Sequence, residues 1–161
     1  MELNCDIFNL FDKQWALVTA GTLADYNTMT ISWGSLGTIW SPANNGRSIA
    51  TIYVKPIRHT FNYLESNEYF TLSFFPESCR KDLLTLGTTS GRDGDKVAKT
   101  SLTPQAVEHG VTFAEASLTL VCRKIYWDDF KKERIPAEVV KTFYQTEEPH
   151  RMYIGEIVAK L

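Results

Sequence analysis

The sequence has few cysteines, little net charge and no long apolar run. Its three cysteines (Cys5, Cys79 and Cys122) are far apart and include no C-x-x-C pair, so they indicate reduced thiols rather than a zinc site or a thioredoxin-like motif. The formal net charge of −2 gives no support for binding to nucleic acid or to an anionic membrane surface. The apolar stretches are all shorter than the roughly 20 residues that a membrane-spanning helix needs.

A secretion signal is also missing. The amino terminus, MELNCDIFNLFDKQ, carries acids where a signal peptide needs basic residues and an apolar segment, so we expect a cytoplasmic protein. Hydrophobic residues make up 43% of the chain and charged residues 22%, which is a globular balance that excludes general disorder. A chain of 161 residues fits one domain, which we place at residues 1–161.

Familiar catalytic and nucleotide-binding signatures do not occur. GTTSG at 87–91 lacks the glycine spacing of G-x-G-x-x-G and the Lys-Ser/Thr ending of a P-loop, and GRDGDK lacks the remaining ligands of a calcium loop. No histidine is paired by spacing with a nucleophile, so hydrolase chemistry is not indicated. We predict no metal site.

The hydrophobic periodicity predicts mainly β-structure with a few short helices. Strands are expected at 15–21, 27–35, 36–40, 48–54, 68–75, 116–127 and 151–161, the last with a bulge at Gly155. Helices are expected at 56–67, 77–87 and 136–144, with a turn at 41–47 and a loop at 88–104. Because the helices do not alternate regularly with the strands, an antiparallel barrel or sandwich is favoured over a βαβ fold.

Two of the expected helices have a predicted inner face. Ile57, Phe61 and Leu64 form one stripe of the first helix. In the helix at 77–87, Ser78 is the expected N-cap, Leu83 and Leu84 face inward, and Gly87 ends the helix.

The stretch NTMTISWGS, at 27–35, alternates small hydroxyls with apolar residues. Thr28, Thr30 and Ser32 should share one face of a strand, because side chains alternate across the sheet. A solvent-facing row would normally include charged residues, and this one has none. Either an edge strand or a wall facing a ligand would account for the row.

Two further stretches bring basic residues together. KPIRHT places Lys55, Arg58, His59 and Thr60 at the mouth of a helix, where acids are normally favoured, so a bound anion or plain surface charge are both open interpretations. SGRDGDK offers two glycines, a hydroxyl and two cations that suit a phosphate. On chemistry alone, a solvated turn in which the arginine and an aspartate pair is the simpler interpretation.

Four segments together resemble the flavin reductase-like family of FMN-binding split barrels, particularly its flavoredoxin-like members. They are YNTMTISWGSLGTIWSP, YVKPIRHTFNYLESNEYFTLSFF, LGTTSGRDGDK and HRMYIGEIV, which occur in the family's order between residue 15 and the end. The resemblance implies a six-stranded antiparallel split β-barrel with a few short peripheral helices. It also implies a homodimer that holds FMN noncovalently at or near the subunit interface.

The resemblance further implies which residues hold the cofactor. Those along the flavin are Asn27, Thr28, Met29, Thr30, Ser32 and Trp33, and the pocket continues with Tyr53, Val54, Lys55, Arg58 and Thr60. Arg58 and Thr60 match phosphate contacts of the family. Ser90, Gly91, Arg92 and Lys96 match the loop that closes over the cofactor, and His150 matches a position near the flavin.

The implied function is an NAD(P)H:flavin reductase, in which NADH or NADPH is the donor and electrons pass through bound FMN to free flavin or another acceptor. No protein acid or base is strictly needed, because the flavin supplies the redox chemistry. SPANNGR and Asp25-Tyr26 depart from the family's usual turns and leave the pyridine-nucleotide side open. The alternatives are a flavoredoxin-like electron-transfer protein reduced by a partner protein, and a non-catalytic flavoprotein.

Overall fold

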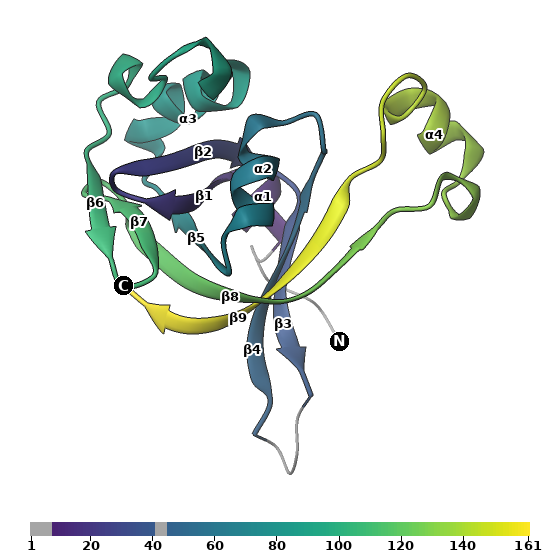
Figure 1. The fold of residues 1–161 in the computed structure, drawn as a ribbon, viewed down its shortest axis with the longest axis horizontal. Helices are drawn as coiled ribbons and strands as arrows, with labels where there is room; N and C mark the ends of the chain where they lie inside the picture. The colour runs from purple at the N-terminus through teal and green to yellow at the C-terminus, as the bar shows by residue number, and fades with distance from the viewer. Residues whose placement is uncertain (1–7, 41–44) are drawn as a thin grey trace.

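A seven-stranded antiparallel sheet forms the body of the computed structural model, which describes residues 8–40 and 45–161 (Figure 1). Within these ranges the strand order is β2-β1-β5-β8-β9-β4-β3. The strands are β1 (Ala16–Thr22), β2 (Asp25–Ile31), β3 (Gly34–Ile39), β4 (Arg47–Val54), β5 (Tyr69–Phe74), β8 (Leu118–Asp129) and β9 (Arg151–Lys160). The sheet curls without closing, and β2 and β3 are its two edges.

Short helices and a small hairpin surround the sheet. They are α1 (Asn9–Asp12), α2 (His59–Ser66), α3 (Arg80–Thr88), α4 (Ala137–Phe143) and the hairpin of β6 (Pro104–Val107) and β7 (Gly110–Phe113). Figure 1 shows α4 carried away from the body at the far end of β8 and β9. None of the helices in the described ranges has the length and apolar character needed to cross a membrane.

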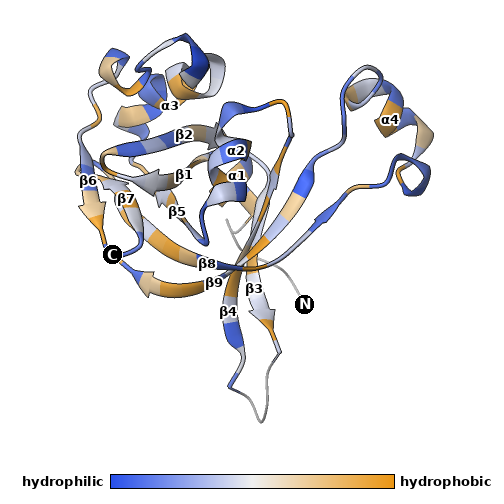
Figure 2. Cartoon of the chain, viewed as in Figure 1, coloured by the Kyte–Doolittle hydropathy of each residue, from blue (hydrophilic) through white to orange (hydrophobic). Residues whose placement is uncertain are grey.

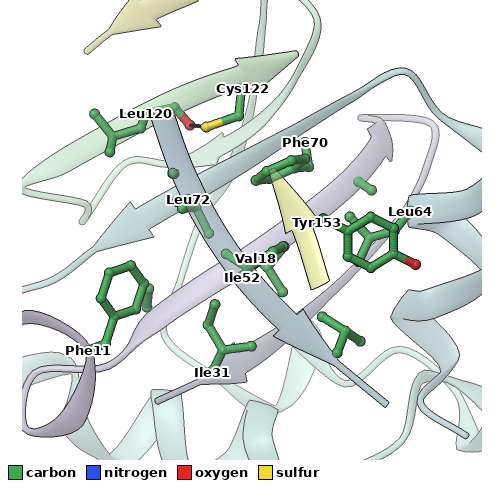
Figure 3. Packing of buried hydrophobic residues seen from close by; sticks show 14 of the residues in the cluster. Phe11, Val18, Ile31, Ile52, Leu64, Phe70, Leu72, Leu120, Cys122 and Tyr153 are labelled. Carbon is green, nitrogen blue, oxygen red and sulfur yellow. Dashed lines mark hydrogen bonds between the residues drawn. The ribbon is translucent and has the colours of Figure 1, made fainter. Parts of the chain in front are cut away.

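The core lies inside the curl of the sheet. Figure 3 shows Val18, Ile52, Phe70, Leu72 and Tyr153, from four different strands, packed against one another, and each is at most 1% exposed. Burial of such side chains is worth about 1.5–3 kcal/mol each. Their positions follow from the period-2 alternation, which turns every second residue of a strand to the same face.

A second cluster packs on the outer face of β1. Leu17 contacts a group that includes Leu83 and Leu86 of α3 and Phe113 of β7. The strand β1 is therefore covered on both faces, which explains its nearly continuous burial from Ala16 to Ala20.

The long strand β8 is divided into two halves of opposite character. Its first half is mostly buried and apolar, and its second half, toward α4, is more exposed and mixes polar residues with exposed aromatic ones (Figure 2). The register with β9 shifts between Val121 and Cys122 and again between Lys124 and Tyr126. These irregularities flank the point where Gly155 of β9 lies opposite Lys124.

The mainly β architecture is confirmed, but the expected number of six strands is wrong. The stretch at 27–35 is not one strand, because β2 ends at Ile31 and the chain then begins β3, which pairs with β4 over six residues. The strand pattern itself predicts seven strands, with β3 expected at 36–40, whereas the number six is what the family resemblance implies.

Three local predictions are also corrected. Leu84 is 53% exposed and Leu86 is buried in its place, because the inward stripe of α3 runs at a spacing of three residues from Leu83. Ser78 lies in a 3₁₀ turn at Glu77–Cys79, which precedes the helix, and α3 continues past Gly87 to Thr88. Ile57 is 58% exposed because it precedes the first turn of α2.

Two short elements were not predicted, and some predictions fall outside the structure. The helix α1 and the strands β6 and β7 have four residues each, which is too short for a hydrophobic periodicity to be recognised. The signal-peptide interpretation, Cys5 and residues 41–44 of the expected turn lie outside the described residues.

Replacement of Gly155 by alanine tests the packing where β9 crosses β8. An added Cβ would lie 2.6 Å from the ring of Phe70 and 2.7 Å from the Cβ of Cys122. We expect Gly155→Ala to lower the free energy of unfolding by about 1–3 kcal/mol, measured by urea denaturation. Gly37→Ala in β3 is the matched control, because its Cβ would meet nothing within 4 Å. Equal unfolding free energies for the two variants would contradict this packing.

Candidate functional site

Two adjoining cavities lie beside the N-terminus of α2. The cationic cavity, about 260 Å³, is lined by Asn27, Met29, residues 57–60, residues 86–92, Lys96 and Glu147. The aromatic cavity, about 250 Å³, is lined by residues 29–33, residues 53–55, Arg58, Phe143 and His150. The two share Met29 and Arg58, so they form one continuous site.

The structure brings the predicted site residues together at these cavities. Every one of them except Thr28 lines the cationic or the aromatic cavity, and so does His150. They come from β2, β4, α2 and the loop after α3, which are far apart in the sequence. Their contact with a cofactor stays a prediction.

The two hydroxyls of β2, Thr28 and Thr30, both bond to neighbouring protein groups. Thr28 is 1% exposed, lies 2.8 Å from the hydroxyl of Thr19 and donates to the carbonyl of Val18. Thr30 donates its hydroxyl to the carbonyl of Leu83 in α3. Thr30, and Ser32 just beyond the end of β2, also line the aromatic cavity, so of the expected row only Thr28 lies away from these two cavities.

The opposite face of β2 supplies the wall of the cationic cavity. Asn27 and Met29 line it, and the side-chain amide of Asn27 donates to the hydroxyl of Thr60 at 2.7 Å. This bond joins the edge strand to the first turn of α2. The alternation predicted for this strand is present: Asn27 and Met29 line the cationic cavity, and Thr30 of the other row lines the aromatic cavity.

Arg58 occupies the N-cap position of α2. Its backbone is extended, its side chain makes no cap hydrogen bond, and the first turn of the helix contains no acidic residue. The guanidinium forms no ion pair or hydrogen bond with any residue in the ranges 8–40 and 45–161. The helix N-terminus adds a partial positive charge at the same place, so the site favours an anion.

Lys96 is a buried cation at the back of the cationic cavity. It is 5% exposed, and its ammonium donates to the carbonyls of Leu86 and Thr89 at 3.0 Å each. Burial and then the nearby charge of Arg58 lower the pKa of Lys96 to about 8. Two of its three donors therefore hold the C-terminal end of α3.

The loop after α3 closes against β2 through a glycine. A Cβ on Gly91 would lie 2.3 Å from the amide oxygen of Asn27, so no larger residue fits without movement. Ser90 accepts a hydrogen bond from the backbone N–H of Arg92. The guanidinium of Arg92 donates to the carbonyl of Ile57 at 2.9 Å, which ties the loop to the chain before α2. Arg92 thus bonds to a backbone carbonyl and not to an aspartate, unlike the solvated turn that was the simpler interpretation of the sequence.

The segment around α4 supplies the outer wall of the aromatic cavity. Trp33 meets Phe143 edge to face at 5.5 Å between ring centroids and lies 4.7 Å from the ring of His150. Lys55, which directly follows β4, pairs with Glu147 and donates to the carbonyl of Phe143 at 3.1 Å. Sequence reasoning missed Phe143 and Glu147, because Lys55 and Glu147 are 92 residues apart and no local pattern joins them.

The pKa values of His150 and Glu147 are both lowered from their ordinary values. Burial, followed by the charges of Lys55 and Arg58, lowers the pKa of His150 to about 4, and its Nδ1 lies 2.8 Å from the hydroxyl of Tyr144. A hydrogen bond from Lys55 lowers the pKa of Glu147 below its ordinary value. At neutral pH the site therefore holds an uncharged imidazole and an ionised carboxylate.

Comparison with known proteins identifies the fold. No family model and no curated protein matches the sequence. Flavoredoxin from Methanosarcina acetivorans is 19% identical with a TM-score of 0.68, over 100% of this chain and 74% of that one. The FMN-binding domain of a flavin reductase-like enzyme from Shewanella baltica is 17% identical with a TM-score of 0.65, over 99% and 74%.

The chain has the flavin reductase-like split-barrel fold. The resemblance seen in the sequence is thereby confirmed at the level of the fold. The NADH:FAD oxidoreductase of Streptomyces globisporus, solved with NAD and FAD fragments, is also similar, at 15% identity and a TM-score of 0.65 over 92% of this chain and 73% of that one.

Titration of His150 tests the electrostatics of the site. Because its pKa is lowered in the folded state, the unfolded chain binds the proton first, so this group makes folding less stable as the pH falls from about 6.5 toward about 4. We expect its imidazole signals in NMR to titrate near pH 4, with the resonance assigned by its loss in His150→Gln. A midpoint near pH 6.5 would show that the ring is solvated and not buried beside two cations.

Proposed function

We propose that the chain binds FMN noncovalently, with the phosphate in the cationic cavity and the ring in the aromatic cavity. The observation that carries the proposal is Arg58, which lines both cavities and forms no ion pair or hydrogen bond within the described residues. A phosphate would supply the anion that this guanidinium and the helix N-terminus favour.

Other polar groups around Arg58 fit the same anion. Thr60 accepts from Asn27 and keeps its own hydroxyl proton to donate. The Nδ1 atom of His59 is buried and has no hydrogen-bond partner among the residues that the structure describes. Buried polar atoms without a partner are costly, so a ligand in this cavity would satisfy an unmet group.

The aromatic cavity suits a flat ring. Trp33 is 41% exposed, and Tyr53, Phe143 and His150 surround the same space. Aromatic side chains contribute apolar area at low conformational cost and stack on planar ligands. The neutral imidazole of His150 offers a hydrogen bond without adding charge beside the ring.

The proposed activity is a flavin-dependent oxidoreductase of the NAD(P)H:flavin reductase type. Bound FMN would supply the hydride-accepting chemistry, while the protein binds the cofactor, orients it and excludes water. Support comes from the fold shared with a flavoredoxin, a flavin reductase-like domain and an NADH:FAD oxidoreductase. NADH or NADPH as the donor, and free flavin or another acceptor, belong to this proposal.

A homodimer also belongs to the proposal. Large apolar side chains are exposed on the segments that project from the body, including Trp40, Trp127 and Phe143 at 46–58%. Pairing with a second copy would cover them.

The direct test is the visible spectrum of the FMN-loaded protein before and after NADH or NADPH under anaerobic conditions. We expect rapid loss of the flavin absorbance. Bleaching only by dithionite or by a partner reductase would overturn the nicotinamide part of the proposal and favour an electron carrier. A protein that cannot be loaded with FMN would overturn the whole.

Removal of the Arg58 guanidinium should weaken FMN binding. We expect Arg58→Ala to raise the FMN dissociation constant by about 10- to 100-fold, which is the worth of a charge-assisted contact of about 1.5–3 kcal/mol. Fluorescence titration measures it. Affinity for riboflavin, which has no phosphate, should stay unchanged in Arg58→Ala. The control variant is Arg134→Ala, which removes a cation from the 3₁₀ turn before α4 and should leave FMN affinity unchanged. A parallel loss of riboflavin affinity would contradict a phosphate contact.

Glu147 should oppose FMN binding, because its carboxylate lies in the cationic cavity. We expect Glu147→Gln to tighten FMN binding by roughly 3- to 10-fold as a like charge is removed. Riboflavin affinity and the neighbouring exposed variant Glu148→Gln are the controls. Unchanged or weaker FMN binding in Glu147→Gln would show that the carboxylate does not face the phosphate.

A further inference from the structure

A third cavity, named here the Asp25 cavity, lies at the start of β2. It has a volume of about 350 Å³ and is lined by residues 23–28, His59, Tyr63, Gly91 and residues 94–97. This size lies within the roughly 300–1,000 Å³ of small-molecule sites. None of its residues belongs to the set predicted from the sequence except those it shares with the cationic cavity, and Thr28.

The three cavities follow one another in a fixed order. The Asp25 cavity shares Asn27, His59, Gly91 and Lys96 with the cationic cavity. Within the described residues, the Asp25 cavity and the aromatic cavity have no lining residue in common. The cationic cavity therefore lies between the other two, and a molecule that fills all three would have its phosphates in the middle.

The chemistry of the Asp25 cavity differs from that of the cationic cavity. Asp25 accepts the hydroxyl of Tyr63 on Oδ1 at 2.7 Å, and Asp95 accepts the backbone N–H groups of Val97 and Ala98 on its own Oδ1. Each carboxylate is thus oriented, and its Oδ2 makes no hydrogen bond with the residues that the structure describes, so it can accept from a ligand. Two carboxylates disfavour a further phosphate and favour hydroxyl and amino donors.

Two phenol rings complete the lining. Tyr63 stands edge to face with His59 at 5.4 Å, and Tyr26 lies beside Asp95. Burial, and then the charge of Asp95, raise the pKa of Tyr26, so its phenol stays protonated. Flat rings for a base and carboxylates for sugar hydroxyls are the groups with which proteins bind nucleosides.

We propose that the Asp25 cavity binds the adenosine part of a flavin dinucleotide, so that the site prefers FAD to FMN. This rests on the proposed flavin binding and extends it. The order ring, phosphates, nucleoside along FAD matches the order of the three cavities. The adenosine of NADH fits less well, because its diphosphate would need the cationic cavity that the flavin phosphate already fills.

The experiment is a pair of titrations, with FMN and with FAD, on the flavin-free protein and on Asp25→Asn. We expect the parent to bind FAD about tenfold more tightly than FMN, and Asp25→Asn to lose most of that difference while its FMN affinity stays within twofold. Asp93→Asn is the control, since Asp93 is an exposed carboxylate in the loop that carries Asp95 but lines none of the three cavities. Tyr63→Leu, which removes a flat ring, should lower FAD affinity several-fold and leave FMN affinity unchanged.

The other outcomes separate the inference from the proposal on which it rests. Binding of neither flavin by the parent would overturn both. Equal binding of FMN and FAD by the parent, or an equal loss of both in Asp25→Asn, would overturn the adenosine site and leave FMN binding standing. A raised KM for NADH in FMN-loaded Asp25→Asn, with unchanged FAD affinity, would assign the cavity to the nicotinamide donor and overturn the FAD assignment.

Discussion

Positive charge gathers at the N-terminus of α2, where the helix already presents the partial charge of its free N–H groups. Arg58 stands at the N-cap with no acid in the first turn to balance it. Burial, with the charge of Arg58 as a further cause, lowers the pKa of Lys96, and burial followed by the charges of Lys55 and Arg58 lowers the pKa of His150. Folding brings these groups together at an electrostatic cost that a bound anion would offset. The cavities on either side take their character from this centre.

The cations around Arg58 are not interchangeable with it. The ammonium of Lys96 donates to backbone carbonyls at the end of α3, and the guanidinium of Arg92 donates to a backbone carbonyl before α2. Lys55 holds the segment around α4 against the barrel through Glu147. These three cations fix the shape of the cavities, and Arg58 is the one that faces both. A loop that could have been a solvated turn is instead part of the wall, since Gly91 lets it lie against Asn27.

Local pattern predicted much of the fold, and the family resemblance named residues that the structure brings together at the two cavities. The β-prone run at 48–54 and the helix after Pro56 lie close to β4 and α2. Alternation along β2 could not say which of its side chains α3 would cover. Thr30 therefore bonds to Leu83 as well as lining the aromatic cavity, whereas Met29 lines both cavities. Glu147 could not be predicted, since its partner Lys55 is brought to it only by the tertiary fold.

The central claim is that a flavin phosphate binds at Arg58 while the ring lies beside Trp33. The most direct measurement is a crystal structure of the protein with FMN. The account predicts phosphate oxygens within about 3 Å of the Arg58 guanidinium nitrogens, and the ring in the aromatic cavity against Trp33 and His150. FMN in the reverse orientation, with its ring among Arg58, Ser90 and Lys96, or FMN bound away from both cavities, would contradict it.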